Sequence, residues 1–182
     1  MSTSLPRVST IVDSPLGPLT LLASAQGLRS VGWEEVSIDV VSDGGWPLSE
    51  SVPVADRSSA TEILRAATTQ LEEYFRGLRT TFDLPLAPTG TPFQRAAWEV
   101  LRTIPFGQTM TYGEQARRLG DANKARAVGA ANGRNPLSII IPCHRVIGAD
   151  GSLTGFSAGV ERKAWLLRHE AAIHGSADRG HR

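Results

Sequence analysis

A segment rich in proline and glycine, Leu84-Pro-Leu-Ala-Pro-Thr-Gly90, separates two parts of the chain that differ in hydrophobic periodicity. In the part before it, short apolar and β-branched runs alternate with turn residues, a pattern typical of an antiparallel meander. In the part after it, apolar residues recur at helical spacing behind helix-capping sequences. The 182 residues are enough to bury two small cores. We therefore predict an α/β N-terminal domain over 1–88, a mostly α C-terminal domain over 89–170, and a polar, frayed tail over 171–182.

The N-terminal part predicts a scaffold rather than a site. Residues 8–12, 19–23 and 28–33 are the expected strands, and residues 80–84 predict one more. The capping-box sequence Ser59-x-x-Glu62 predicts a helix that begins there and buries the apolar positions of 63–78. Residues 36–57 contain Gly and Pro at irregular intervals and predict an irregular connection.

The C-terminal part predicts a helix-turn-helix. Thr91-Pro92-Phe93-Gln94 opens a helix to about Thr103, and Thr111-Tyr112-Gly113-Glu114 opens a short helix that stops at Gly120. A break over 121–124 leads into a second short helix to about residue 131, nearly all of it small residues around Arg126. Such a helix permits close approach to a duplex but little base readout. The alternative is that these small residues only allow tight helix packing.

The remaining segments lead to and from a single cysteine. Residues 138–142 are an apolar run that predicts a buried strand ending at Cys143. Asp150-Gly151 predicts a hairpin turn between 145–148 and 152–155, which would be the wing of a winged helix. A closing helix is expected to end near Glu170.

Charge is distributed unevenly along the chain. Residues 1–89 contain 6 basic and 11 acidic residues, whereas residues 90–170 contain 11 basic and 6 acidic residues, although the net charge is only +1. This asymmetry favours a polyanion as partner of the C-terminal part, with chance clustering as the alternative. The N-terminus has no apolar signal region, and no apolar stretch is long enough to cross a membrane. We expect a cytoplasmic protein that does not contact membranes.

The lone cysteine excludes an intramolecular disulfide and any multi-cysteine zinc site. Taken alone, a Cys after an isoleucine run is more often a small buried hydrophobe than a nucleophile. However, Cys143 lies at the predicted end of a strand, and His144 and Arg145 follow it, so we expect the local field to favour the thiolate. Glu170 offers a carboxylate that could orient the imidazole, the general arrangement of cysteine catalysis.

The residues around Cys143 resemble the active-site signature of the O6-alkylguanine-DNA alkyltransferases, the methylated-DNA–protein-cysteine methyltransferases. Ile141-Pro-Cys-His-Arg-Val146 carries the resemblance, with Asn135-Pro136 before it. The family's order and spacing extend over residues 90–170, through Ile104-Pro-Phe-Gly107, Thr111-Tyr-Gly113, Ala125-Arg-Ala-Val-Gly129 and Leu166-Leu167. Ser14-Pro-Leu-Gly-Pro-Leu19 is similar to the family's weaker N-terminal pattern.

The resemblance implies a ribonuclease-H-like N-terminal domain, a winged helix-turn-helix C-terminal domain and direct reversal of DNA alkylation. The damaged guanine, mainly O6-methylguanine with O4-methylthymine as a second substrate, would be flipped out of duplex DNA. Its alkyl group would pass irreversibly to Cys143 in a single turnover, with no cofactor or metal. The protein would act as a monomer, with cooperative binding along DNA left open.

The resemblance also implies a role for individual residues. Cys143 would be the acceptor, His144 would take its proton through a water, and Glu170 would hold the imidazole. Asn135 would hold the turn beside Cys143, Tyr112 would donate to guanine N3 and crowd a phosphate, and Arg126 would replace the flipped base in the stack. Further DNA contacts would come from the residues around Arg126, namely Lys124, Ala125, Ala127, Gly129 and Arg134. The substrate pocket would be formed by Pro142, Val146, Phe156, Ser157 and Lys163.

Most of these residues also have a plain structural explanation. Tyr112 could pack into the core, Arg126 could contact a phosphate, and Lys163 could be a solvated lysine. One departure from the family is Phe156, where a Tyr is common, so a hydroxyl donor is missing near O6 and the tolerance of bulky alkyl groups stays open.

Three other functions fit parts of the sequence. A non-catalytic reader of alkylated DNA would not need Cys143 and His144. A winged-helix regulator with a redox-sensing cysteine leaves Tyr112, Asn135 and Glu170 unexplained. A papain-like hydrolase has its Cys and His far apart in sequence.

Overall fold

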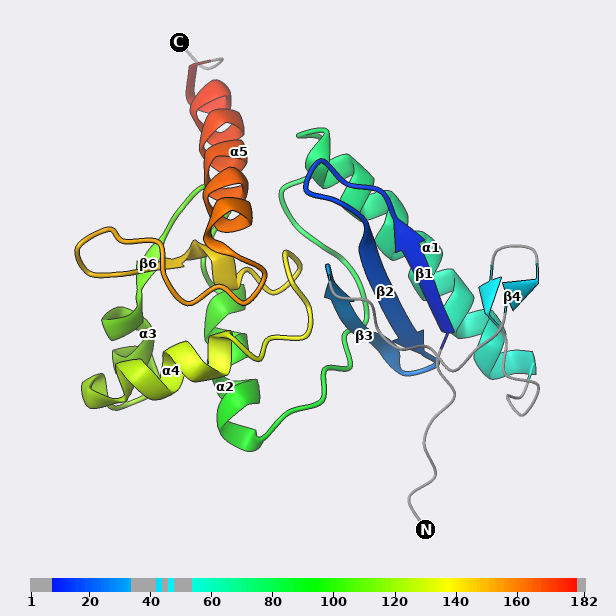
Figure 1. Ribbon diagram of the computed structural model, residues 1–182, viewed down its shortest axis with the longest axis horizontal. Helices are drawn as coiled ribbons and strands as arrows, with labels where there is room; N and C mark the ends of the chain where they lie inside the picture. The colour runs from blue at the N-terminus through cyan, green and yellow to red at the C-terminus, as the bar shows by residue number, and fades with distance from the viewer. Residues whose placement is uncertain (1–7, 34–41, 44–45, 48–53, 180–182) are drawn as a thin grey trace. The chain divides into compact units, whose positions relative to one another are not determined.

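The computed structural model describes residues 8–33, 42–43, 46–47 and 54–179, and the chain divides into two compact units, 1–88 and 89–182. In the N-terminal unit, β1 (Val8–Val12), β2 (Leu19–Ser24) and β3 (Gly27–Gly32) form an antiparallel sheet in the order β1-β2-β3 (Figure 1). Val8 pairs with Ala23, and Thr20 pairs with Gly32. The predicted meander is therefore confirmed.

Helix α1 (Val54–Phe75) packs on this sheet and buries Leu64, Leu71 and Tyr74. The prediction that it begins at Ser59 is wrong, because residues 54–58 contain no helix breaker and the helix extends through them. The predicted strand over 80–84 is also wrong. The chain meets β3 later instead, where Leu28 donates to Pro85 O at 2.8 Å and accepts from Ala87 N at 2.8 Å.

Within the connection expected to be irregular, β4 (Ser42–Asp43) and β5 (Trp46–Pro47) pair antiparallel. Residues 36–41, 44–45 and 48–53 of that connection lie outside the described residues. None of the residues predicted for the site belongs to this unit.

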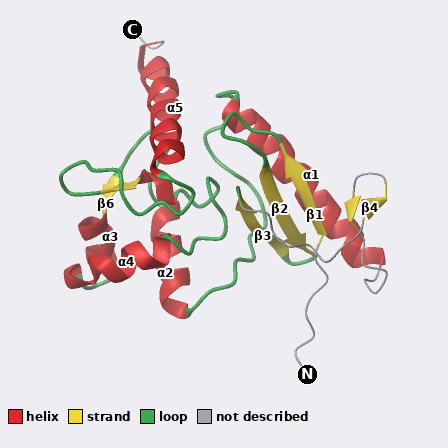
Figure 2. Cartoon of the chain, viewed as in Figure 1, coloured by secondary structure: helices red, strands yellow, loops and turns green. Residues whose placement is uncertain are grey.

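The C-terminal unit is mostly helical (Figure 2). It contains α2 (Pro92–Arg102), α3 (Tyr112–Arg118), the short 3-10 helix η1 (Ala122–Lys124) and α4 (Ala125–Asn132). Both predicted capping boxes are confirmed, because Thr91 and Thr111 each accept from the third helical amide while Gln94 and Glu114 bond back to them. The helix-turn-helix of α3 and α4 thus begins where the sequence indicates.

Buried polar contacts fix the packing of α2, α3 and α4. Trp98 Nε1 donates to Ala131 O at 2.9 Å, which joins α2 to α4. Gln115 and Asn132 exchange amide hydrogen bonds at 3.1 and 2.7 Å, which joins α3 to α4. All of these side chains are buried, so each bond is made away from competing water.

The segment before Cys143 differs from the prediction. Residues 138–141 form tight turns rather than a strand, and Cys143 begins the 3-10 helix η2 (Cys143–Arg145). Ile139 has a positive φ of 72°, a conformation that β-branched residues rarely adopt and that no extended strand contains. An apolar run cannot by itself distinguish a buried strand from a buried turn.

The predicted turn at Asp150-Gly151 is present, but the segments on its two sides do not pair as strands, and the predicted end of the last helix is wrong. Strand β7 (Val146–Ile147) pairs in parallel with β6 (Met110–Thr111), while Gly148 N donates to Ser152 O across the turn at Asp150-Gly151. Helix α5 (Val160–Arg179) continues past Glu170 through residues expected to fray. Among the described helices, none combines the length and the apolar character needed to cross a membrane.

Candidate active site

Cys143 lies at the start of η2, and only 6% of its surface is exposed. The turn that leads to it is closed by Asn135, whose Nδ2 donates to Ile141 O at 2.8 Å and to Cys143 Sγ at 3.2 Å. Oδ1 of the same amide accepts from Leu137 N at 3.0 Å. One side chain therefore satisfies the backbone of the turn and contacts the sulfur that the turn presents.

The environment of Cys143 does not favour the thiolate, contrary to the expectation from its basic neighbours. Burial raises the pKa of the Cys143 thiol, and the Asn135 hydrogen bond and the charge of Lys163 oppose this only in part. An ordinary cysteine is already a thiol at pH 7. Reaction therefore needs a base that removes the proton.

His144 and Glu170 are brought together as expected. His144 Nε2 and Glu170 Oε1 are 2.8 Å apart, and both side chains are buried. Because a carboxylate can only accept, we assign the proton to Nε2, which leaves Nδ1 with a lone pair. Nδ1 is buried and has no hydrogen-bond partner among the described residues. The imidazole is therefore oriented and has one free basic nitrogen.

The charge of His144 is set by opposing effects. Burial lowers its pKa most, contact with Glu170 raises it, and the charges of Arg145 and Lys163 lower it further. The hydrogen bonds from His144 and Arg145 outweigh the burial of Glu170 and bring the pKa of that carboxyl to about 2. Glu170 is thus an anion at physiological pH, and burial favours the neutral form of the imidazole beside it.

Arg145 is a residue that the sequence reasoning did not assign to the site. It is 6% exposed and holds Glu170 with Nε to Oε2 at 2.8 Å and Nη2 to Oε1 at 3.0 Å. Its signals in the sequence are its place next to His144 and within the Ile141–Val146 signature. The turn of η2, rather than a strand, brings both side chains to one carboxylate.

Tyr112 and Lys163 meet at the carbonyl of Thr154. Tyr112 Oη donates to Thr154 O at 2.8 Å, and Lys163 Nζ donates to the same oxygen at 2.7 Å and to Val146 O at 2.5 Å. Lys163 is fully buried, so the alternative of a solvated lysine is excluded. The pKa of Tyr112 is raised by burial and by the nearby Cys143. Two proton donors thus lie beside the segment that leads to Phe156.

The candidate pocket residues differ in exposure. Pro142, Val146 and Phe156 are buried, with Phe156 8% exposed, whereas Ser157 is exposed. Gly155 next to Phe156 has a φ of +68° and lies close against the Tyr112 hydroxyl.

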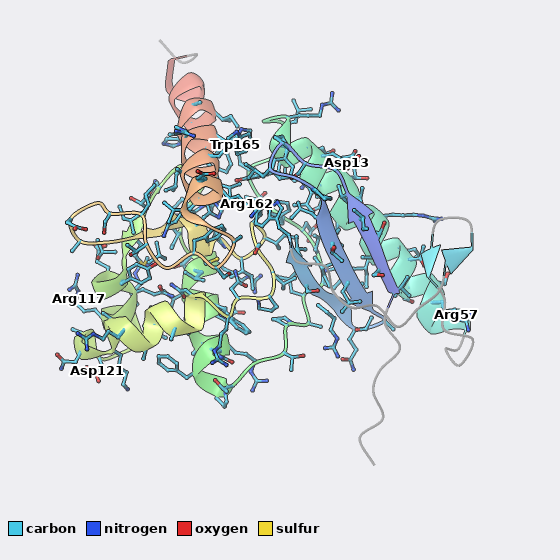
Figure 3. All side chains as sticks on the ribbon, viewed as in Figure 1. Asp13, Arg57, Arg117, Asp121, Arg162 and Trp165 are labelled. Atoms are coloured by element: carbon cyan, nitrogen blue, oxygen red, sulfur yellow. The ribbon has the colours of Figure 1, made fainter. Side chains whose placement is uncertain are left out.

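The candidate DNA-binding residues lie on and next to α4. Arg126, Ala127, Lys124 and Arg134 are exposed, and Ala125 and Gly129 are half-buried. Lys124 Nζ is 3.7 Å from the carboxylate of Asp121. Asp121 and Arg117 are both labelled in Figure 3, near α3 and α4. A Cβ on Gly129 would make ordinary contact, at 3.7 Å, with the Tyr112 ring. The exposed face of α4 is therefore flat and carries Arg126 as its long side chain.

In the part of the chain that the structure describes, no three His, Cys, Asp or Glu side chains are grouped so that they could hold a metal ion.

Comparison with known proteins gives matches over both units. The family model for the 6-O-methylguanine DNA methyltransferase ribonuclease-like domain matches residues 8–88, and the model for the DNA binding domain of the same proteins matches residues 92–172. The ribonuclease-like expectation for the N-terminal unit is thereby confirmed.

Relatives and solved structures agree with these matches. A methylated-DNA–protein-cysteine methyltransferase of Shigella flexneri is 48% identical over 89% of this chain and 94% of its own length. One from Methanosarcina acetivorans is 43% identical over 89% of this chain and 97% of its own. The crystal structure of Mycobacterium tuberculosis OGT in complex with DNA has a TM-score of 0.73 at 41% identity and covers 91% of this chain and 93% of that one.

Proposed function

The chain belongs to the methylated-DNA–protein-cysteine methyltransferase family, and from that premise we propose how its residues carry out DNA repair by methyl transfer to a cysteine. Cys143 is the acceptor and takes the alkyl group from O6 of guanine, with O4-methylthymine as a second substrate. The observation that carries this proposal is a pair of buried contacts at adjacent residues of η2: Asn135 with the Cys143 sulfur, and His144 with Glu170.

Proton transfer starts at the Cys143 thiol. His144 Nδ1 is the one imidazole nitrogen with a free lone pair, and it receives the thiol proton through a water. Glu170 fixes the tautomer and stabilises the imidazolium that forms. Asn135 donates to the sulfur and so stabilises the thiolate as it develops.

The thiolate attacks the alkyl carbon. The S–C bond forms as the C–O bond breaks, and the electron pair of that bond stays with the guanine. Donors near the leaving base stabilise its charge, a role that suits Lys163, which has a third N–H beyond its two carbonyl bonds, and Tyr112 when its hydroxyl turns from Thr154 O to the base. Because Phe156 lacks a hydroxyl, the Ser157 amide is the remaining donor that we assign to O6 in this segment.

Access to the lesion needs the base out of the duplex, because an acceptor that is 6% exposed cannot reach into a base stack. The flat face of α4, with Ala127 and Gly129, lies in the minor groove, and Arg126 fills the space left by the flipped base. Lys124 and Arg134 contact phosphates, so binding depends strongly on salt and weakly on sequence.

The reaction occurs once for each protein molecule. Its product is a thioether, which has no carbonyl through which water could be activated to release the alkyl group, and the chain has a single Cys. Every residue in the proposed mechanism comes from one chain, so we propose that the protein acts as a monomer. We also propose that it acts on DNA in the cytoplasm.

The alternatives from the sequence are less well supported. A non-catalytic reader does not need a basic His144 nitrogen next to a buried thiol. A redox sensor typically uses an exposed cysteine of low pKa, whereas burial raises the pKa of Cys143.

The decisive experiment is mass spectrometry after incubation with duplex DNA that carries O6-methylguanine. One methyl mass is expected on the peptide that contains Cys143, and Cys143→Ala is expected to bind the same duplex without being modified. An unmodified peptide beside intact lesion, with folded protein in excess, would rule out the proposal.

A further inference from the structure

Glu170 is held by more donors than a carboxylate needs in order to orient an imidazole. Besides His144, it accepts two bonds from Arg145 and one from Gly107 N at 3.0 Å. We propose that Arg145 is a positioning residue that supplies the counter-charge of Glu170, so that His144 stays neutral and remains available as the base. This inference rests on the proposed function, because the base it concerns is the one that deprotonates Cys143.

The geometry around Arg145 is that of a fixed group. Its Nη1 donates to Ile104 O at 2.6 Å, and its guanidinium carbon lies 5.6 Å from the centre of the Phe106 ring. Carbonyl, ring and carboxylate therefore hold one buried cation from three sides. Arginine suits this place because its planar fork bonds a carboxylate with two parallel donors.

The Ile104–Gly107 turn gains a role from these contacts. Its first residue binds Arg145 through a carbonyl, its third through a ring, and its last binds Glu170 through an amide. Gly107 has a φ of +74°, and a Cβ there would lie 2.7 Å from the Cβ of His174 on α5. Only glycine lets the turn come this close to the helix that carries Glu170.

Burial makes Glu170 depend on a neighbouring cation. Glu170 is 1% exposed, and a buried anion must have a cation beside it. Arg145 and His144 each contact its carboxylate with a side chain, and Lys163 is a further charged group that acts on His144. If Arg145 loses its charge, the neighbour able to take up a proton is His144. A protonated His144 cannot accept the proton of Cys143.

A merely structural ion pair predicts something different. It would stabilise the unit without changing the ionisation of His144, so its loss would lower stability alone. The two cases are separated by measuring the ionisation of His144 directly, with nitrogen-15 NMR of labelled histidine in the full chain. The His144 signal is assigned by its absence in His144→Gln.

The test compares Arg145→Met with Arg145→Lys, and uses Arg102→Met as the matched control because Arg102 pairs with Glu99 on the surface. Arg145→Met is expected to move the His144 titration to higher pH. It is also expected to slow transfer from a free O6-alkylguanine base at pH 7 by about 10-fold to 100-fold, part of what a positioned base supplies. Raising the pH should recover the rate, and Arg145→Lys should restore much of it. Arg102→Met should change neither measurement.

An unshifted or downward-shifted His144 titration in folded Arg145→Met would overturn the proposal. If that variant does not fold, Glu170→Gln is compared with the double variant Glu170→Gln/Arg145→Met, since removing both charges of a buried pair is often tolerated. The His144 titration must then lie at higher pH in the double variant than in Glu170→Gln. If the two titrations coincide, the proposal is overturned. Because NMR needs no substrate, an inactive wild-type protein would contradict the proposed function and leave this test intact.

Discussion

Replacing Gly155 with alanine is expected to displace the hydroxyl of Tyr112. Gly155 has a φ of +68°, and a Cβ at this position would overlap the Tyr112 oxygen. The backbone is held on one side by Lys163, which donates to Thr154 O at 2.7 Å. The tyrosine must therefore move, and its own 2.8 Å bond to Thr154 O is lost.

The loss of stability in Gly155→Ala can be separated into two parts by comparison with Gly120, another glycine of positive φ. Gly120 has a φ of +89° with nothing near its Cβ position, so Gly120→Ala measures the left-handed penalty alone, about 1–2 kcal/mol. Gly155→Ala adds the loss of one hydrogen bond, whose net value is about 0.5–1.5 kcal/mol. The Thr154 oxygen keeps its bond to Lys163, so no buried acceptor is left without a partner. We expect Gly155→Ala to be about 1 kcal/mol less stable than Gly120→Ala.

Urea unfolding of the two full-length variants measures this difference as a shift of the midpoint at constant slope. Single-turnover transfer from an O6-methylguanine duplex gives the functional result. Gly155→Ala should be slower than Gly120→Ala, because Tyr112 no longer stands where it can donate to the base. Equal midpoints and equal rates would show that the tyrosine hydroxyl is not held in this way.

Three further predictions concern other groups of the site. The depressed pKa of Glu170 contributes stability that is complete above its ordinary value of 4.5 and is lost as the pH falls toward about 2. The stability difference between wild type and Glu170→Gln should therefore shrink by about 3 kcal/mol over that window, and urea midpoints that fall in parallel would contradict this. Asn135→Ala should cost about 1–3 kcal/mol, because the Leu137 amide loses its partner while the Ile141 carbonyl keeps its bond from Cys143 N, and a urea midpoint near wild type would refute it. Arg126→Ala should slow repair of duplex DNA far more than transfer from a free base; equal losses, measured by radiolabel transfer, would exclude insertion into the stack.

The features that the sequence predicted well are those that local chemistry decides. Thr91 with Gln94 and Thr111 with Glu114 form their capping boxes because each box is completed within four residues. Ser59 with Glu62 matches the same pattern but lies inside α1. The preceding residues continue a helix without strain, so the pattern there marks no boundary.

The turn before Cys143 could not be predicted from local preference. An apolar run flanked by Pro136 and Pro142 fits a buried strand equally well. The turn is stable because the Asn135 side chain bonds Ile141 O and Leu137 N, and such bonds are visible only once the chain is folded.

The same limit explains why Arg145 was not assigned to the site. Adjacent residues on a strand point to opposite sides, so a strand would have separated Arg145 from His144. In η2 both reach Glu170, a residue 25 positions further along the chain.

The burial of Cys143 has a consequence for a reagent that is used once. A protein molecule that is never regenerated is inactivated for good if one electrophile or oxidant reacts with its cysteine before it meets a lesion. Such side reactions depend on the thiolate fraction and on access to the sulfur. A neutral thiol that is 6% exposed has a small thiolate fraction and little access to solvent. Cys143 is therefore protected from side reactions until an alkylated nucleobase enters the pocket. The pocket therefore protects the unreacted thiol as well as making it reactive toward the lesion.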